Sequence, residues 1–88
     1  MEAMHRIVIR DIDKRDRAWP FAIWEVAKTT GCSTSSVTRT LRELETIKLI
    51  SRSNRGYGSR HYRVTLAWNN VEQVIDDFET ARVLRVPQ

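Results

Sequence analysis

The fold is decided by the stretch EVAKTTGCSTSSVTRTLRELE, residues 25–45. Gly31 separates two helix-like patterns and stands where a left-handed residue commonly ends a helix. Ser33 suits the start of the next helix, because a serine hydroxyl can accept a hydrogen bond from a free backbone N–H of the first turn. The stretch therefore predicts a helix over residues 21–30, a tight turn, and a second helix from Ser33 to about Thr46.

The second of these helices has two contrasting faces. Val37, Leu41 and Leu44 recur at helical spacing and define its buried stripe. A rotation of about 100° per residue from that stripe places polar and basic side chains on the far side. These are Ser35, Ser36, Arg39, Arg42 and Glu43.

The segments on either side predict the remaining elements. Residues 2–14 are predicted as helix, although their β-branched run also suits a strand. Residues 49–53 and 60–66 are typical of two short strands, joined by a turn that contains Gly56 and Gly58. In the second strand Tyr62, Val64 and Leu66 alternate with polar residues, so we expect one face to pack. A last helix is predicted over residues 70–84, with Asn69 as its cap.

The last helix carries an apolar stripe with two interpretations. It either closes the core of the monomer or pairs with a second copy across a two-fold axis. We favour the homodimer, because a domain this small contacts only a short stretch of a binding partner, and two-fold pairing lengthens the stretch that is contacted. The residues assigned to dimerisation are Trp68, Val71, Val74, Ile75 and Phe78.

The remaining aromatic and sulfur side chains suggest packing rather than chemistry. Trp19, Trp24 and Trp68 belong to different elements and share no spacing, so we expect them in the core or an interface. Cys32 follows the turn glycine and is expected in the core.

Length and composition exclude several classes of protein. The chain has 88 residues, 41% of them hydrophobic and 30% charged, which predicts one globular domain over residues 1–88 with its core at about residues 5–66. We expect a cytoplasmic protein, because neither a membrane-length apolar run nor a signal peptide is present. A lone cysteine and two histidines predict no metal site and no cofactor. We find no catalytic constellation and expect neither an enzyme nor a small-molecule ligand.

The charge is unevenly distributed. The chain carries a formal charge of +4 and a pI near 9.8. Residues 39–63 hold seven Lys or Arg against two Glu, whereas residues 64–88 hold two Arg against four acids. Clustered cations of this kind are the electrostatic footprint of a protein that binds nucleic acid.

Taken together, the segments resemble the winged helix-turn-helix regulators, the broad group that includes MarR-like, GntR-like and ArsR-like proteins. The likeness spans about residues 22–65 and rests on the order of the runs EVAKTTGCSTSSVTR, LRELE, LISR and GSRHYRVT. Lys48 departs from the pattern, because members commonly have a glycine there.

The resemblance implies a mainly α fold of the α+β class, with three helices, a two-stranded wing and a C-terminal helix. It also implies that the helix from Ser33 enters the major groove of double-stranded DNA and that the wing reaches a neighbouring backbone or the minor groove. The residues predicted to contact DNA are Ser33, Ser35, Ser36, Thr38, Arg39, Arg42, Arg52, Arg55, Tyr57, Arg60 and Arg63.

The leading hypothesis is a sequence-specific transcriptional regulator that acts by occupying its operator. A second hypothesis is a DNA-binding protein for plasmid or viral replication, partition or excision. A third is a winged helix that docks onto another protein in a larger complex, with an acidic protein surface against Arg39 and Arg42. Salt dependence of duplex binding separates the third from the first two.

Overall fold

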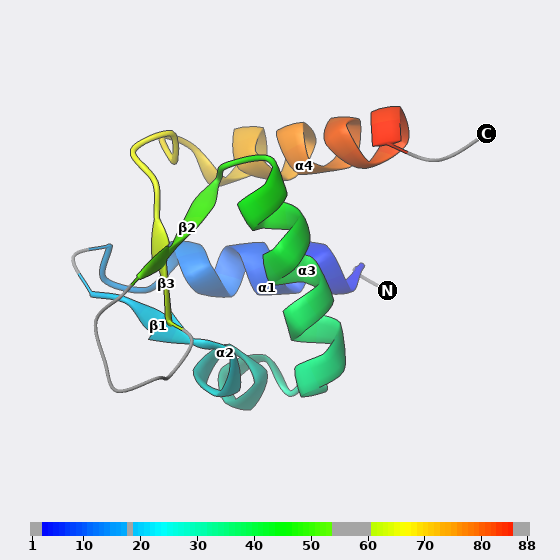
Figure 1. The fold of residues 1–88 in the computed structure, drawn as a ribbon. Helices are drawn as coiled ribbons and strands as arrows, with labels where there is room; N and C mark the ends of the chain where they lie inside the picture. The colour runs from blue at the N-terminus through cyan, green and yellow to red at the C-terminus, as the bar shows by residue number, and fades with distance from the viewer. Residues whose placement is uncertain (1–2, 18, 54–60, 86–88) are drawn as a thin grey trace.

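The computed structural model describes residues 3–17, 19–53 and 61–85 (Figure 1). A helix and a short strand come first, followed by two helices, two strands and a last helix, and the boundaries fall close to those predicted. The elements are α1 (Met4–Asp13), β1 (Phe21–Ala22), α2 (Ile23–Thr30), α3 (Thr34–Thr46), β2 (Ile50–Ser53), β3 (His61–Val64) and α4 (Val71–Arg85).

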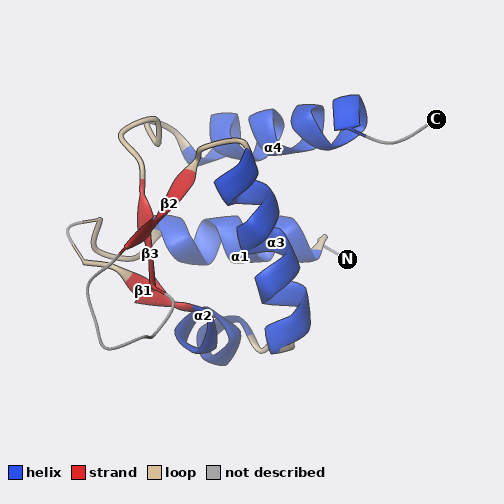
Figure 2. Cartoon of the chain, viewed as in Figure 1, coloured by secondary structure: helices blue, strands red, loops and turns tan. Residues whose placement is uncertain are grey.

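The helices and the sheet occupy different ends of the molecule. Figure 2 shows the three strands gathered at one end, while α4, α1 and α2 are stacked from top to bottom. Helix α3 lies in front of α1 and packs against α1, α2 and β2. One face of α3 is thereby buried, and the opposite face is turned to solvent.

The sheet has three strands, one more than the sequence predicts. The strand order is β1-β3-β2, and both pairings are antiparallel. Phe21 and Ala22 were expected to open α2, but they pair with Tyr62 and His61 of β3 and are both buried. The rings of Phe21 and Tyr62 also stack at 6.3 Å between centroids. Pro20 favours extended backbone in the residue before it. Pairing with β3, which is distant in sequence, then holds Phe21 and Ala22 in the extended conformation.

The predicted packing face of the second strand is shorter than expected. Tyr62 is buried and Val64 is half-buried, but Leu66 is 98% exposed. Strand β3 ends at Val64, and Thr65 makes the next contact with the opposite segment, where its backbone N–H and its hydroxyl both donate to the carbonyl of Leu49. The inclusion of Leu66 in the packing face was wrong.

Helix α1 resolves the ambiguity between helix and strand in the first segment. Val8, Ile9 and Ile12 are fully buried at helical spacing. Ile7 is half-buried and Met4 is 42% exposed, so the apolar face of α1 is centred on Val8, Ile9 and Ile12. This face packs beneath α2, α3 and α4.

Helix α4 closes the core of the monomer. Trp68, Val74, Ile75 and Phe78 are all at most 4% exposed within a single chain, and Val71 packs against them. The indole N–H of Trp68 donates to the carbonyl of Leu49, which satisfies its polar atom inside the core. The assignment of this stripe to a dimer seam is therefore corrected, because its side chains are already covered by the chain's own core.

The cap of α4 lies one residue later than predicted. The side-chain oxygen of Asn70 accepts from the backbone N–H of Glu72 at 2.8 Å and of Gln73 at 3.4 Å. Asn70, rather than Asn69, therefore caps the helix. Two adjacent asparagines offer the same chemistry, so the sequence pattern alone does not distinguish them.

The end of α3 explains the unusual lysine that follows it. The N–H of Leu49 donates to the carbonyl of Leu44 at 2.9 Å, and the N–H of Lys48 donates to that of Glu45 at 3.0 Å. This is the Schellman pattern, in which one residue takes a left-handed backbone. Lys48 is that residue, with φ of 67°. The turn thus keeps the conformation usual for glycine, although a lysine occupies it.

We expect Lys48→Gly to raise the free energy of unfolding by about 0.5–1 kcal/mol. A side chain with a Cβ carries a steric cost in the left-handed region, and glycine removes that cost. Chemical denaturation measures the change. Lys48→Ala is the matched control, because it removes the same charge but keeps the Cβ, and it should give no gain. Equal stabilisation by both variants would show that charge, not backbone conformation, is responsible.

Two ion pairs join α1 to α4. Arg6 contacts Glu79, with its Nε donating to Oε1 at 3.0 Å, and Arg10 Nη2 lies 3.2 Å from Glu72 Oε1. The hydrogen bond from Arg6, assisted by the charges of Arg6 and His5, holds the pKa of Glu79 below its ordinary value. The carboxylate of Glu79 is thus favoured in the folded state.

The Arg6–Glu79 pair should make stability depend on pH in the acid range. A lowered folded-state pKa adds stability above the unfolded value near 4.5, and this stability is lost as pH falls through the folded value. Glu79→Gln is therefore expected to flatten the fall of the thermal midpoint between about pH 5 and pH 3. Asp76→Asn, an exposed change on the same helix, should keep the wild-type profile. If the Glu79→Gln and wild-type profiles coincide, the pair contributes nothing.

Candidate nucleic-acid interface

Helix α3 begins at the predicted cap. The hydroxyl oxygen of Ser33 accepts from the backbone N–H of Ser36 at 3.2 Å, and the two serine hydroxyls lie 2.9 Å apart. Gly31 precedes the cap with φ of 73°, and its N–H donates to the carbonyl of Ala27. The turn between α2 and α3 is thus fixed by a left-handed glycine and a serine cap, as the sequence predicts.

The outward face of α3 is polar and basic. Val37, Thr40, Leu41 and Leu44 are buried against the core. On the opposite side the exposed residues are Ser35, Arg39, Arg42 and Thr46. A groove-facing helix requires this arrangement, because small side chains near its start allow close approach and arginines further along reach base edges or phosphates.

The predicted hydroxyl residues of α3 differ in what they can contact. Thr38 is half-buried and its hydroxyl donates to the carbonyl of Thr34 at 2.7 Å. Ser36 is half-buried and bonded to Ser33. Ser35 is exposed, and its hydroxyl has no partner within the part of the chain that the structure describes. Ser35 is therefore the hydroxyl group most available to an incoming ligand.

Cations on the described part of the chain fall into two groups. Five arginines of α1, the loop after it and α4 are paired with acids: Arg6 with Glu79, Arg10 with Glu72, Arg15 with Asp11 and Glu25, Arg17 with Asp13, and Arg82 with Glu43. Those that lack an acidic partner among residues 3–17, 19–53 and 61–83 are exposed: Lys14, Lys28, Arg39, Arg42, Lys48 and Arg63. All but Lys14 belong to α2, α3, the turn after α3, or the sheet.

Two of the predicted DNA-contacting arginines lie in the described strands: one is exposed and unpaired, and the other forms an ion pair. Arg63 of β3 is exposed. Arg52 of β2 donates from Nε to Glu45 Oε2 of α3 at 2.9 Å, so its charge is partly neutralised. This contact ties the sheet to α3. The predicted wing residues Arg55, Tyr57 and Arg60 lie outside the described residues.

The sequence prediction missed the exposed flank of α2. Trp24 is 61% exposed, and Lys28, four residues later, is also exposed. Trp19 is 64% exposed as well, so of the three tryptophans only Trp68 lies in the core. Cys32 packs against the core as expected. The sequence did contain a signal for this exposed flank, because the i, i+4 spacing of Trp24 and Lys28 places both opposite the apolar residues of α2.

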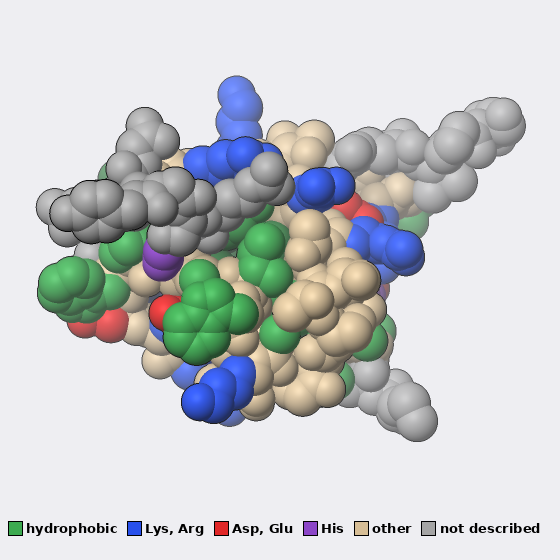
Figure 3. Space-filling view, turned by 60° about the horizontal axis from the view of Figure 1, so that its bottom comes forward, with side chains coloured by type: hydrophobic (Ala, Val, Ile, Leu, Met, Phe, Trp, Pro, Cys, Tyr) green, Lys and Arg blue, Asp and Glu red, His purple; other side chains and the backbone are tan. Residues whose placement is uncertain are grey.

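The side of the molecule that carries α2 shows these features together. In Figure 3 this side faces forward, and Lys and Arg side chains lie around an area of other side chains and backbone. Hydrophobic side chains lie beside that area. Exposed hydroxyl residues of α2, of α3 and of the turn between them are Thr29, Ser33, Thr34 and Ser35. The exposed surface is thus a mixture of cations, hydroxyls and apolar groups, with little acid.

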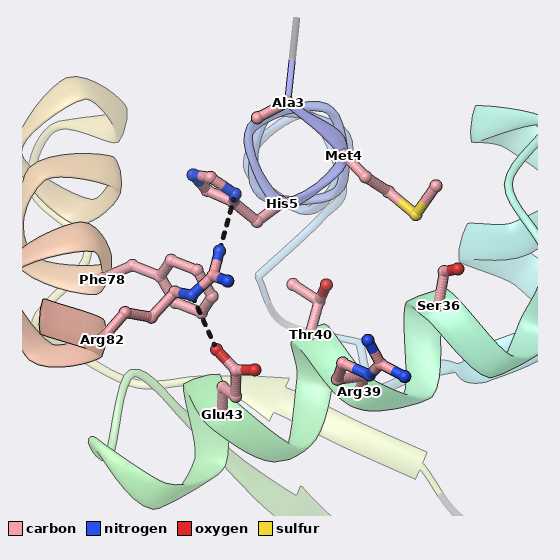
Figure 4. Close-up of a pocket in the computed structure, with 9 residues that line it drawn as sticks. All are labelled: Ala3, Met4, His5, Ser36, Arg39, Thr40, Glu43, Phe78 and Arg82. Atoms are coloured by element: carbon pink, nitrogen blue, oxygen red, sulfur yellow. Dashed lines mark hydrogen bonds and ion pairs between the residues drawn. The ribbon is translucent and has the colours of Figure 1, made fainter. Parts of the chain in front are cut away.

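A small cavity lies behind α3, between α1 and α4 (Figure 4). Its volume is about 290 Å³, just under the roughly 300–1,000 Å³ of typical ligand pockets. Arg82 of α4 crosses it, with Nη1 3.3 Å from His5 Nδ1 and Nε 3.6 Å from Glu43 Oε2. This bridge links all three helices at the flank of α3, where Glu43, which was predicted on the outer face, is half-buried instead. The absence of a small-molecule ligand stays a prediction.

Metal-ligand clusters and membrane-spanning helices are both absent from the described residues. No group of three or more His, Cys, Asp or Glu among them is placed to hold a metal ion. None of the helices within those residues is long and apolar enough to cross a membrane.

Comparison with known proteins supports the fold. No protein-family model and no curated protein matches the chain. Among solved structures, the chain is similar to a mutant of MepR from S. aureus, with a TM-score of 0.64 and 16% sequence identity. The alignment covers 100% of this chain and 68% of the MepR chain. At this identity the likeness establishes the fold, and the predicted α+β winged helix is confirmed.

Proposed function

We propose that this protein binds double-stranded DNA sequence-specifically and regulates transcription by occupying its operator. The observation that carries the proposal is the division of cations into paired and unpaired groups. Arg39, Arg42 and Arg63 are exposed on the α3 and sheet side, and they lack acidic partners in the described chain. Unpaired exposed arginines retain their full charge for phosphates and base edges.

In this proposal α3 enters the major groove. Arg42 and Arg39 extend from its exposed face, and a guanidinium can form two hydrogen bonds to the O6 and N7 atoms of guanine. Ser35 lies one turn earlier and is short enough to let the helix approach the backbone. The bridge from Arg82 to Glu43, on the flank of α3 that is turned toward α4, holds the helix in place while its outer face binds.

The sheet side supplies contacts to phosphates. Arg63 and Lys48 are exposed and suited to the backbone beside the groove that α3 occupies. We extend the proposal to the predicted wing residues Arg55, Tyr57 and Arg60, with Arg55 entering the minor groove.

Charge also orients the molecule on the duplex. Helix α4 carries Asp76 and Asp77 on its exposed surface, together with Glu72. Phosphates repel these acids, so α4 faces away from the DNA. Because its apolar stripe is buried, the proposed homodimer must use another surface.

Selection of bound sequences from a random duplex pool tests the proposal. We expect enrichment of one motif, and a palindromic motif if the protein binds as a homodimer. Sedimentation of the free protein at tens of micromolar checks the homodimer separately. Recovery of the pool without any enriched motif would contradict sequence-specific binding and with it the role as a regulator.

A further inference from the structure

The exposed flank of α2 carries an aromatic ring beside a cation. Trp24 is the second residue of α2, and Lys28 follows it by four residues, which places both on one face of the helix. Trp24 is 61% exposed, and Lys28 has no acidic partner among the residues that the structure describes. A tryptophan ring this open to water leaves a large apolar surface without a partner inside the chain.

The orientation of this flank follows from the contacts of α1. Arg15, just after α1, reaches across to α2, where its guanidinium contacts Glu25 Oε2 at 3.7 Å and Thr29 Oγ1 at 2.9 Å. Trp24 and Lys28 lie about 100° around the helix from those two residues, away from α1. Helix α1 packs against both α2 and α3. Helix α2 also packs against α3, so the Trp24–Lys28 flank and the exposed face of α3 belong to neighbouring helices.

We infer that Trp24 and Lys28 bind the sugar-phosphate backbone of duplex DNA beside the groove that α3 enters. This inference rests on the proposed function and extends its site to α2. Lys28 pairs with a phosphate, while the indole of Trp24 covers a deoxyribose and donates its N–H to a phosphate oxygen. The contact is independent of sequence, so it fixes the position of α3 on the duplex without selecting a base.

The surroundings of Trp19 provide a contrast within the same chain. Trp19 is 64% exposed, but the groove it lines also contains Asp16 and Glu25. Arg15 lines the same groove and pairs with Glu25, so two acids stand against one cation there and the net charge does not attract a phosphate. Charge complementarity thus assigns the backbone contact to Trp24 and leaves Trp19 outside it.

Matched alanine variants test the inference. Trp24→Ala should weaken binding about tenfold, on the preferred duplex and on an unrelated duplex alike, because a charge-assisted hydrogen bond and the ring contact are lost. Trp19→Ala removes the same side chain at nearly equal exposure and should leave affinity unchanged. Fluorescence anisotropy of a labelled duplex measures both, and circular dichroism confirms that both variants fold.

Tryptophan emission gives a second readout that does not depend on a loss of binding. In the Trp19→Phe variant the remaining tryptophans are the exposed Trp24 and the buried Trp68. We expect emission to change in parallel with the anisotropy of the bound duplex. The inference would be overturned if the Trp19→Phe variant binds the duplex without a change in emission and Trp24→Ala binds as tightly as the wild type. The proposed function would then remain intact. Absence of duplex binding by the wild-type protein would overturn both.

Discussion

Phe78→Ala is expected to lower the free energy of unfolding by about 3–5 kcal/mol, the usual cost of truncating a buried phenylalanine. The ring is 1% exposed and stacks on His5 with 5.0 Å between centroids. The guanidinium of Arg82 lies 5.7 Å from the ring centre on α4. Truncation therefore leaves a cavity where α1 meets α4 and removes the surface on which Arg82 rests.

Urea denaturation followed by circular dichroism measures this loss. Val83→Ala, on the same helix at 73% exposure, is the control and should change stability by less than about 0.5 kcal/mol. Sedimentation of Phe78→Ala also shows whether Phe78 belongs to the core of the monomer or to a dimer seam. If Phe78→Ala folds with wild-type stability and only dissociates a dimer in sedimentation, the placement of Phe78 in the monomer core is wrong.

The second large effect is expected at the exposed face of α3. The double variant Arg39→Ala/Arg42→Ala should lower affinity for the preferred duplex about 100-fold or more, since each arginine that contacts a base or phosphate contributes roughly 1–3 kcal/mol. Neither side chain has a partner in the described chain, so thermal stability should change little. Loss of binding with retained stability is the signature of a contact residue.

Lys14→Ala provides the control for charge. Lys14 is also exposed and unpaired within the described residues, but it lies at the end of α1 rather than on α3 or in the sheet. Removing its charge should reduce affinity by less than about threefold, through long-range attraction alone. Equal losses in Lys14→Ala and in Arg39→Ala or Arg42→Ala would mean that net charge, rather than the face of α3, determines binding.

Elements whose signals are local could be predicted from the sequence. The turn at Gly31 and the cap at Ser33 depend on residues within one helical turn, and both are present as expected. The buried stripe of α3 follows from the 3.6-residue period, because each helix must cover one face with apolar side chains. These features fixed the position of the candidate site.

Features that depend on distant partners could not be predicted. Strand β1 has two residues and no alternation, and it exists because β3 offers an edge more than thirty-five residues away in sequence. The apolar stripe of α4 looks the same whether α1 or a second chain covers it. Only the packing of Phe78 against His5 shows that α1 does so.

The candidate site divides in the same way. Helical spacing placed Arg39 and Arg42 on the outer face of α3, and the structure agrees. The same spacing says nothing about pairing between elements, so the contact of Arg52 with Glu45 was not foreseen. Trp24 was expected in a core or interface from its residue type, whereas its exposure depends on how α2 is rotated against α1.

The most direct test of the account is the salt dependence of duplex binding by the wild-type protein. Each neutralised phosphate contributes roughly −0.9 to the slope of log affinity against log salt concentration. The unpaired cations Lys28, Arg39, Arg42, Lys48 and Arg63 predict a slope of about −4 to −5 per chain, and steeper if the wing contributes. A slope near zero, or no binding at low salt, would contradict the account and favour a winged helix that docks onto another protein.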